Sequence, residues 1–578
     1  MSYTQARRYW ASASSSSAAS HSAACASCGV GAASASRRRV RAVAAFEKDA
    51  ALPGEGYRLS VSKDGVRIAA ASETGAFYAG MTLRQLLRAD GTVPCVEIFD
   101  APKFPWRGLH LDESRHFFGK ATVLRLLETM AKFKLNVLHW HLTDNQGWRI
   151  PIPGYPELTR TVRPAENRRN FRDTATGIVP PAAYTREELE EVVRRAHELH
   201  IRVMPEVEIP GHSEAVLKAQ PECGCFPPDE YADGGPSNQV RNAVCPGRDA
   251  TIRFYERVLD TVCEIFPDAV VHIGGDECDR SNWKTCQRCQ ARMRREGLKD
   301  VAELQAWTTA HFQRYLADKG RRLMGWDEIA EGGLPASAMV MSWRGVSTGV
   351  VAAKNGHDVV MTPNEFCYFD YEQGLEHDDA AYPYNWTVPL PLVKVYAFDP
   401  LRGIPPAFQA HVLGAQGNNW TEMTCTGSEL EWKLWPRAAA LAEVLWSYPS
   451  RRDFADFTKR AESCRARLVA SGVNAAPVAR RVSPVRGVLT RTGDRIDYVS
   501  GATRACVEIV DGDLVLTVNG MRARTFRKTG RFVELEVLED CDGSFFVTAR
   551  RDTSEIVATV RLEGERVLAK ERWDYAGR

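Results

Sequence analysis

Apolar runs with the length and alternation typical of β-strands recur along the middle of the chain, and helical patterns lie between several of them. The runs are RGLHLDES (107–114), NVLHWHLTD (136–144), IRVMPEVEI (201–209), AVVHIGGDE (269–277), RRLMGWDE (321–328), AMVMSWRG (338–345), HDVVMTP (357–363) and VLGAQGNNW (412–420). Apolar residues at helical spacing occupy 120–134, 185–200, 249–266 and 303–320. Strands that alternate with helices predict an α/β fold, and eight of them suit a (β/α)8 TIM barrel. A doubly wound open sheet is the alternative, which is disfavoured because no glycine-rich phosphate fingerprint follows the first run.

A smaller unit precedes the barrel pattern. Residues 57–71 alternate around Asp64-Gly65, which indicates a β-hairpin, and a helical pattern follows it. We therefore predict a small N-terminal α/β domain at 45–104, truncated at its beginning. Residues 1–44 are rich in Ala and Ser, and this low-complexity composition predicts disorder.

Helical patterns at 428–447 and 454–470 close the barrel region, which we place at 105–477. From about residue 486 the character of the sequence changes. Short strand-like runs are separated there by Asp-Gly and Asn-Gly pairs, which are typical of tight hairpin turns. We predict a C-terminal all-β domain at 486–578, built as a small sandwich.

Composition excludes several classes of partner. The formal net charge is +2 and 26% of the residues are charged, so nothing favours a nucleic-acid partner. No apolar run is long enough to serve as a membrane segment. The beginning of the chain, as written, lacks a signal-peptide pattern, which predicts a cytoplasmic protein; a different start would permit export. The sequence leaves the oligomeric state unknown.

Fifteen cysteines are spread along the chain, an odd number that does not indicate a disulfide framework. Cys278, Cys286 and Cys289 lie close together in sequence, and the last two form a CxxC. A zinc knuckle requires four ligands, and no second CxxC lies nearby, so free thiols are the favoured interpretation. A bridge between Cys223 and Cys245 is an alternative if the protein is exported.

Polar and aromatic side chains collect where the predicted strands end. The first four strands lead to Asp112, Glu113, Arg115, His116, His139, His141, Asp144, Glu206, Glu208, His212, Asp276 and Glu277. The last four lead to Trp326, Asp327, Glu328, Trp343, Arg344, Tyr368, Asp370, Trp420 and Glu422. In a (β/α)8 barrel these ends meet at one mouth, where the active site is built.

The mixture of carboxylates and tryptophans at this mouth has a chemical meaning. Flat aromatic faces stack on the CH faces of sugars, and carboxylates and arginine bind hydroxyls, so the composition indicates a carbohydrate ligand. A catalytic metal would use His139, His141 and His212. No HExxH or comparable ligand set is present, so we predict no metal and no cofactor.

Eight stretches resemble, in order, the motifs of a known family. They are RGLHLDESRHFF, KFKLNVLHWHLTDNQGWR, MPEVEIPGH, HIGGDE, GWDE, SW, YFD and QGNNWTE. Together they are similar to glycoside hydrolase family 20, the β-N-acetylhexosaminidases, over about residues 57–475. The resemblance implies a (β/α)8 barrel behind a small α/β domain, as the alternation predicts independently.

The resemblance also implies catalytic residues. Glu277 matches the general acid/base, and Asp276 matches the group that holds the substrate's acetamido nitrogen. Tyr368 is similar to the tyrosine that binds the acetamido carbonyl oxygen. Asp144 and His212 resemble a buried relay that supports the acid/base.

Substrate-binding positions follow from the same resemblance. The walls of the acetamido pocket are implied to be Trp326, Trp343 and Trp420. Arg115 matches the arginine on the sugar's O3 and O4, Glu422 matches a second hydroxyl ligand, and Asp370 resembles a further position near O4 or O6. The implied partner is a terminal β-linked N-acetylhexosamine of an oligosaccharide or glycoconjugate.

The implied reaction is an exo-acting hydrolysis with retention of configuration. Most retaining glycosidases use a protein carboxylate as nucleophile, whereas family 20 uses the substrate's own acetamido oxygen and passes through an oxazolinium ion. We expect burial and the neighbouring Asp276 to keep Glu277 protonated. Two alternatives stay open: a barrel glycosidase whose nucleophile is Glu206 or Glu208, and a sugar-binding protein without activity. Preference for gluco or galacto sugars is not determined by the sequence.

Overall fold

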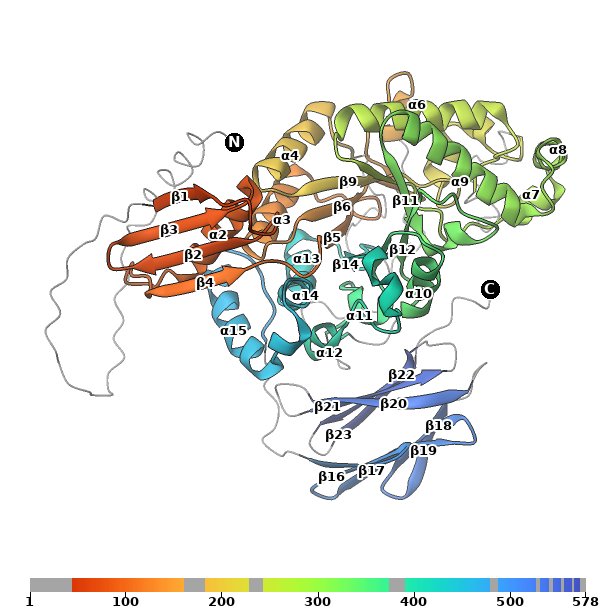
Figure 1. Ribbon diagram of the computed structural model, residues 1–578. Helices are drawn as coiled ribbons and strands as arrows, with labels where there is room; N and C mark the ends of the chain where they lie inside the picture. The colour runs from red at the N-terminus through yellow and green to blue at the C-terminus, as the bar shows by residue number, and fades with distance from the viewer. Residues whose placement is uncertain are drawn as a thin grey trace, which may run out of the picture. The chain divides into compact units, whose positions relative to one another are not determined.

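The computed structural model describes residues 44–160, 182–227, 243–373, 390–478 and 487–526, followed by 531–539, 544–551, 556–563 and 566–571. The chain divides into two compact units, Met1–Pro102 and Lys103–Arg578. Figure 1 shows their elements in chain order. The predicted disordered segment 1–44 lies outside the described residues except for Ala44, where the first strand begins. No helix in the described ranges is both long and apolar enough to cross a bilayer.

From residue 44 onward, the N-terminal unit is one mixed sheet with one helix. Its strands, in spatial order, are β1 (Ala44–Lys48), β3 (Gly65–Ala70), β2 (Tyr57–Ser62) and β4 (Val96–Asp100). Helix α2 (Glu73–Leu86) packs on β2 and β3 and begins at Ser72, whose hydroxyl accepts from the N–H of Gly75. The antiparallel pair β2–β3 confirms the predicted hairpin; its turn is Lys63 and Asp64, and Gly65 begins β3 opposite Ser62.

The second unit contains a closed barrel of eight parallel strands, which confirms the predicted fold and excludes the open sheet. The strands are β5 (Trp106–Asp112), β6 (Val137–His141), β9 (Arg202–Glu206), β10 (Val270–His272), β11 (Arg322–Trp326), β12 (Met339–Ser342), β13 (Val359–Met361) and β14 (Val412–Asn419). Seven of them lie within one of the eight predicted runs, and β5 begins one residue before the run at 107–114. A short hairpin of β7 (Thr143–Asp144) and β8 (Gly147–Trp148) follows β6.

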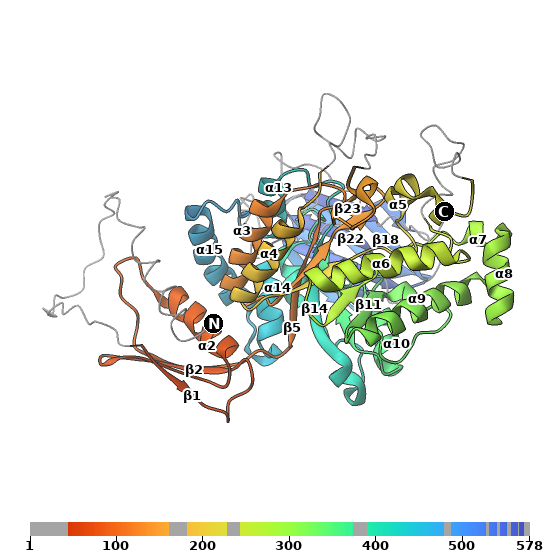
Figure 2. The same ribbon diagram turned by 90° about the horizontal axis from the view of Figure 1, so that it is seen from above.

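Helices surround the barrel strands (Figure 2). They are α3 (Lys120–Lys132), α4 (Arg186–Glu198), α6 (Asp249–Ile265), α9 (Val301–Asp318), α10 (Val346–Lys354), α13 (Gly427–Leu434), α14 (Arg437–Trp446) and α15 (Phe454–Ala470). Helix α4 packs on β9, α9 packs on β11, and α14 packs on β14 and β5. The single helix predicted at 428–447 is two helices, because Pro436 lacks the N–H that would continue α13.

Short helices lie in the connections that follow the strands. They are α5 (Glu214–Ala219), α7 (Ser281–Thr285), α8 (Gln287–Glu296), α11 (Asn364–Cys367) and α12 (Leu392–Ala397). Helix α4 begins with a capping box, in which the Thr185 hydroxyl and the Glu188 carboxylate each accept from the other residue's backbone N–H. The sequence predicted this box but none of the short helices.

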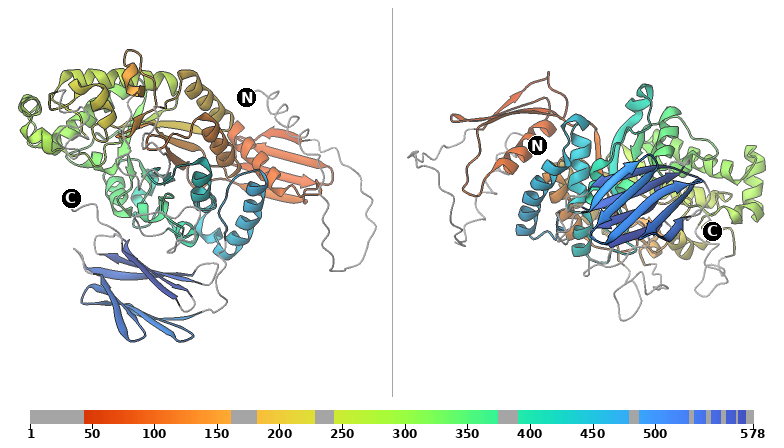
Figure 3. Two further views of the ribbon diagram at one scale, coloured as in Figure 1. Left: turned by 180° about the vertical axis from the view of Figure 1, so that it is seen from behind. Right: turned by 90° about the horizontal axis from the view of Figure 1, so that it is seen from below.

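The C-terminal part is an antiparallel sandwich (Figure 3), as predicted. One sheet contains β15 (Val488–Thr492), β16 (Arg495–Ser500), β17 (Thr503–Val510), β18 (Asp513–Val518) and β19 (Met521–Phe526). The other contains β20 (Phe532–Glu539), β21 (Phe545–Arg551), β22 (Ile556–Glu563) and β23 (Arg566–Glu571). Both sheets contribute buried side chains to one apolar core, including Ile496, Leu516, Leu535 and Val560.

Candidate active site

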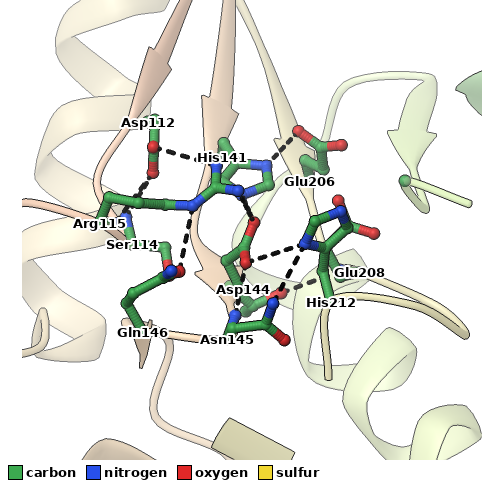
Figure 4. Close-up of polar contacts among 12 residues, drawn as sticks. Asp112, Ser114, Arg115, His141, Asp144, Asn145, Gln146, Glu206, Glu208 and His212 are labelled. Atoms are coloured by element: carbon green, nitrogen blue, oxygen red, sulfur yellow. Dashed lines mark hydrogen bonds and ion pairs between the residues drawn. The ribbon is translucent and has the colours of Figure 1, made fainter. Parts of the chain in front are cut away.

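Five of the predicted site residues form one connected set beyond the carboxyl ends of neighbouring strands. Arg115 follows β5, Asp144 follows β6, His212 follows β9, and Asp276 and Glu277 follow β10. Parallel strands in a closed barrel end on the same rim, so residues far apart in sequence converge there. Figure 4 shows Arg115, Asp144 and His212 turned toward one another.

The contacts run from Arg115 to the adjacent acids. Arg115 Nη2 lies 2.8 Å from Asp144 Oδ2, and Asp144 Oδ1 lies 3.2 Å from His212 Nδ1. On its other side, His212 Nε2 lies 3.5 Å from a carboxylate oxygen of Asp276 and 3.5 Å from one of Glu277. His212 is therefore the one link in this set between Asp144 and both acids.

The charges along this set alternate in sign. Burial acts to raise the pKa of Asp144, but Arg115 and His212 outweigh it and hold that pKa well below its usual range. Burial acts to lower the pKa of His212, but Asp144 and Asp276 outweigh it and raise that pKa well above its usual range. His212 is therefore an imidazolium at neutral pH, and both of its ring nitrogens carry protons to donate.

The backbone explains how neighbouring acids reach one site. Strand β10 ends at His272, so the alternation of side chains has stopped before Asp276. Gly274, Gly275 and Glu277 then adopt positive φ angles of 64°, 94° and 43°. A Cβ on Gly274 would lie 1.9 Å from Glu208 Oε2, so only glycine fits there.

The exposure of the two acids differs. The Asp276 side chain is 11% exposed, whereas that of Glu277 is 45% exposed. The expectation that burial surrounds Glu277 is not met by the protein's own residues, because Glu277 lies five residues past the end of β10, at the open mouth. One oxygen of Asp276, Oδ1, is buried and has no hydrogen-bond partner among the described residues.

Four predicted aromatic residues lie side by side around the mouth, each ring next to the following one. The ring centroids of Trp326 and Trp420 are 5.6 Å apart, and those of Trp420 and Tyr368 are 6.4 Å apart. The rings of Tyr368 and Trp343 are 6.1 Å apart and nearly parallel, at 20°. Burial raises the pKa of Tyr368 well above its usual range, so its hydroxyl stays protonated and available as a donor.

Asp112 holds Arg115 and Glu328 holds Trp343, and neither role was predicted from the sequence. Asp112 accepts from the backbone N–H of Arg115 at 3.1 Å and lies 3.2 Å from its guanidinium. Glu328 accepts from the indole N–H of Trp343 at 2.9 Å. Both residues stood among the polar strand ends, but sequence position alone does not show which neighbour a side chain contacts.

The remaining two predicted ligands also lie in this region. Glu422 Oε1 is 3.7 Å from Arg115 Nη2, and the Arg115 guanidinium lies 5.0 Å over the Trp420 ring. Burial raises the pKa of Asp370 to about 7 and raises that of Glu422 as well.

A buried carboxylate, Glu206, lies in the barrel interior next to the set. Its oxygens lie 3.0 Å from His139 Nε2, 2.5 Å from His141 Nδ1 and 2.9 Å from His272 Nδ1, and one of them accepts from the indole N–H of Trp326 at 2.8 Å. Burial acts to raise the pKa of Glu206, but the histidines hold it well below its usual range. Because both of its oxygens are occupied, Glu206 is unsuited to attack a sugar.

The same histidines were the basis of the metal alternative. His110, His139 and Glu206 could group around an ion, but Glu206 already accepts from its neighbours, so we assign no metal there.

Glu208, the other candidate nucleophile, is buried. Burial and the charge of Asp276 raise the pKa of Glu208 well above its usual range, which keeps it protonated and unreactive as a nucleophile.

The barrel and the carboxylates and tryptophans at its mouth define the class: a (β/α)8 glycoside hydrolase. The profile of the glycosyl hydrolase family 20 catalytic domain matches residues 104–449, and that of domain 2 of the same family matches residues 9–101. The chain belongs to glycosyl hydrolase family 20. The domain 2 match begins inside the segment predicted to be disordered, so the boundary at 45 stays a prediction.

Known relatives agree with this assignment. A β-hexosaminidase of Porphyromonas gingivalis is 41% identical over 440 residues, which cover 74% of this chain and 55% of the relative. A β-hexosaminidase of Akkermansia muciniphila is 33% identical over 71% of this chain and 83% of the relative. The solved structure of a family 20 exo-β-N-acetylglucosaminidase from Vibrio harveyi, in complex with N-acetylglucosamine, is 30% identical with a TM-score of 0.67. It matches 75% of this chain and 69% of that structure.

Proposed function

We propose that the chain is a retaining, exo-acting β-N-acetylhexosaminidase that uses the substrate's acetamido group as nucleophile. The observation that carries this proposal is the buried Oδ1 of Asp276, which lacks a hydrogen-bond partner among the described residues. A buried carboxylate oxygen without a partner is costly, and an acetamido N–H would supply that partner. Tyr368 lies close enough for the charge of Asp276 to act on its hydroxyl.

The roles of the acids follow from their surroundings. Glu277, at the open mouth, gives its proton to the glycosidic oxygen, and a bound sugar completes the burial that the protein does not provide. The Asp276 carboxylate orients the acetamido N–H and offsets the positive charge that develops on the oxazolinium ring. Tyr368 donates to the acetamido oxygen and holds it in line with the anomeric carbon.

His212 supports the second half of the reaction. Its Nε2 proton faces both acids at 3.5 Å, so it stabilises the carboxylate that Glu277 becomes after proton transfer. Glu277 then accepts a proton from the water that opens the oxazolinium ion, and the two inversions at the anomeric carbon give net retention. No protein nucleophile is needed, which agrees with the occupied oxygens of Glu206.

Hydrolysis of p-nitrophenyl N-acetyl-β-glucosaminide tests the proposal. We expect turnover of this substrate and none of p-nitrophenyl β-glucoside, which lacks the acetamido group. Glu277→Gln should remove most turnover, and Asp276→Asn should lower kcat by about 100-fold or more. Equal turnover of both substrates would instead indicate a protein nucleophile, and absence of turnover with retained sugar binding would indicate an inactive lectin-like protein.

A further inference from the structure

Four cysteine sulfurs converge in the connections that follow β9 and β10. Cys225 and Cys245 belong to the first connection, and Cys286 and Cys289 belong to the second. The four sulfurs all lie within 4.8 Å of one another. The CxxC pattern at Cys286 and Cys289 did not predict this group, because the β9 connection that supplies Cys225 and Cys245 is distant in sequence.

The separations of the sulfurs fit a single tetrahedral ion. Cys225 and Cys289 sulfurs are 3.9 Å apart, those of Cys245 and Cys286 are 3.7 Å apart, and those of Cys245 and Cys289 are 3.4 Å apart. Four ligands about 2.3 Å from a central zinc lie about 3.8 Å from one another. A disulfide would bring two sulfurs to about 2.05 Å and leave the others unmatched.

The surrounding backbone holds this geometry. Cys286 directly precedes α8, Cys289 lies in its first turn, and the backbone N–H of Cys289 donates to the Cys286 sulfur. Gly247 follows Cys245 by two residues, and a Cβ there would lie 2.4 Å from the backbone of Arg288 and Cys289. The glycine therefore lets the Cys245 turn lie directly against the start of α8.

The site is shielded from water on one side. Cys245 and Cys289 are fully buried, and they belong to an apolar cluster with Trp283, Met293 and other side chains. The Trp283 indole N–H donates to the carbonyl of Val244 at 3.0 Å and so joins the same two connections. The alternative bridge between Cys223 and Cys245 is not formed: both thiols are free, and the Cys245 sulfur is directed to the α8 cysteines.

We propose that one structural zinc ion is bound by four thiolates: Cys225, Cys245, Cys286 and Cys289. Tetrahedral sulfur sites select zinc or iron, and closed sites with four protein ligands are structural rather than catalytic. The short separations fit one ion better than a multi-iron cluster, whose sulfur ligands surround a larger volume. The site joins the connection that carries His212 to the one that carries Asp276 and Glu277.

Metal analysis of the purified full chain tests this proposal without reference to activity. We expect about one zinc per chain by elemental analysis, with release on mercurial treatment of the thiols. Cys286→Ser and Cys289→Ser should each lower the zinc content at least tenfold. Cys464→Ser, which alters a half-buried thiol on α15 outside the cluster, is the matched control and should keep the full zinc content.

A second measurement uses the unaltered chain, so it does not depend on whether the variants fold. Replacing the bound ion with cobalt(II) should give the absorption of a tetrahedral tetrathiolate site. Absence of both zinc and the cobalt spectrum would overturn the proposal, as would stoichiometric iron or disulfides among the four cysteines. Equal loss of zinc in Cys464→Ser and Cys286→Ser would overturn the choice of ligands.

Discussion

Replacing Asp144 with Asn tests the electrostatic role of the relay. The Asp144 side chain is 1% exposed and lies 2.8 Å from Arg115, 3.1 Å from His141 and 3.2 Å from His212. Asn keeps the shape and one acceptor oxygen but removes the charge that these donors surround. Removal of one partner from a buried ion pair costs about 3–5 kcal/mol, and the retained oxygen places the expected loss of unfolding free energy at about 3 kcal/mol.

The pH at which this loss is measured matters. Asp144 has a pKa below its unfolded value of about 3.9, so its contribution is present above that pH and lost as the pH falls through the folded pKa. His212 has a pKa above its unfolded value of about 6.5, so its contribution is present below that pH and lost as the pH rises through the folded pKa. The destabilisation by Asp144→Asn should therefore be largest between about pH 4 and 6.5.

Activity should report the same change. Because Asp144 is the strongest charge that raises the pKa of His212, its removal lowers that pKa. The alkaline limb of kcat/KM for p-nitrophenyl N-acetyl-β-glucosaminide should move to lower pH, and kcat should fall by about 100-fold from the loss of alignment.

Urea unfolding at pH 5.5 and pH–rate profiles measure both effects. The control is Asp456→Asn. The Asp456 side chain is 62% exposed and pairs with Arg460, so this substitution should cost less than about 0.5 kcal/mol of unfolding free energy. An Asp144→Asn protein with an unchanged alkaline limb and a stability loss as small as that of the control would refute this account of the relay.

Three further substitutions each test the role of one residue. Glu206→Gln should lower the unfolding free energy by about 3–5 kcal/mol in urea titration, because it removes the anion that three histidines and Trp326 contact; a loss under about 1 kcal/mol would contradict that role. Glu208→Gln should cost less than about 1 kcal/mol at pH 7, because the wild-type carboxyl is already protonated; a large loss there would show that it is ionised. Gly247→Ala should lower zinc content and thermal stability together, because the added methyl group meets the backbone of α8; retention of zinc at unchanged melting temperature would count against that contact.

The barrel was predictable because its evidence is local. Each strand is a short apolar run, and polar residues follow it at once, so order along the chain gives both the strands and the rim. Tyr368, Trp343 and Trp420 were identified in this way, since each lies directly after or close to the end of a strand. The strand pattern alone did not assign roles to these residues; the resemblance of the ordered motifs to family 20 did.

Other features depend on direction in space, which the sequence does not carry. Glu206 and His141 end neighbouring strands, but only the closed barrel shows that both side chains point inward to one contact of 2.5 Å. The cysteine site joins Cys225 to Cys289, 64 residues apart, so no local spacing rule finds it. The exposure of Glu277 also escaped prediction, because it depends on where the chain turns after Gly275.

The position of the acids relative to His212 depends on the connections more than on the sheet. Two backbone hydrogen bonds link these connections just past the strands. The N–H of Val207 donates to the carbonyl of His272 at 3.0 Å, and the N–H of Ile209 donates to that of Ile273 at 2.8 Å. Beyond them, His212 and Glu277 both have left-handed backbone angles, which for such residues cost about 1–2 kcal/mol each. Strained residues keep such angles only where surrounding structure holds them. The proposed zinc site joins these two connections, so an ion bound there would help to hold the 3.5 Å contact at the open barrel mouth.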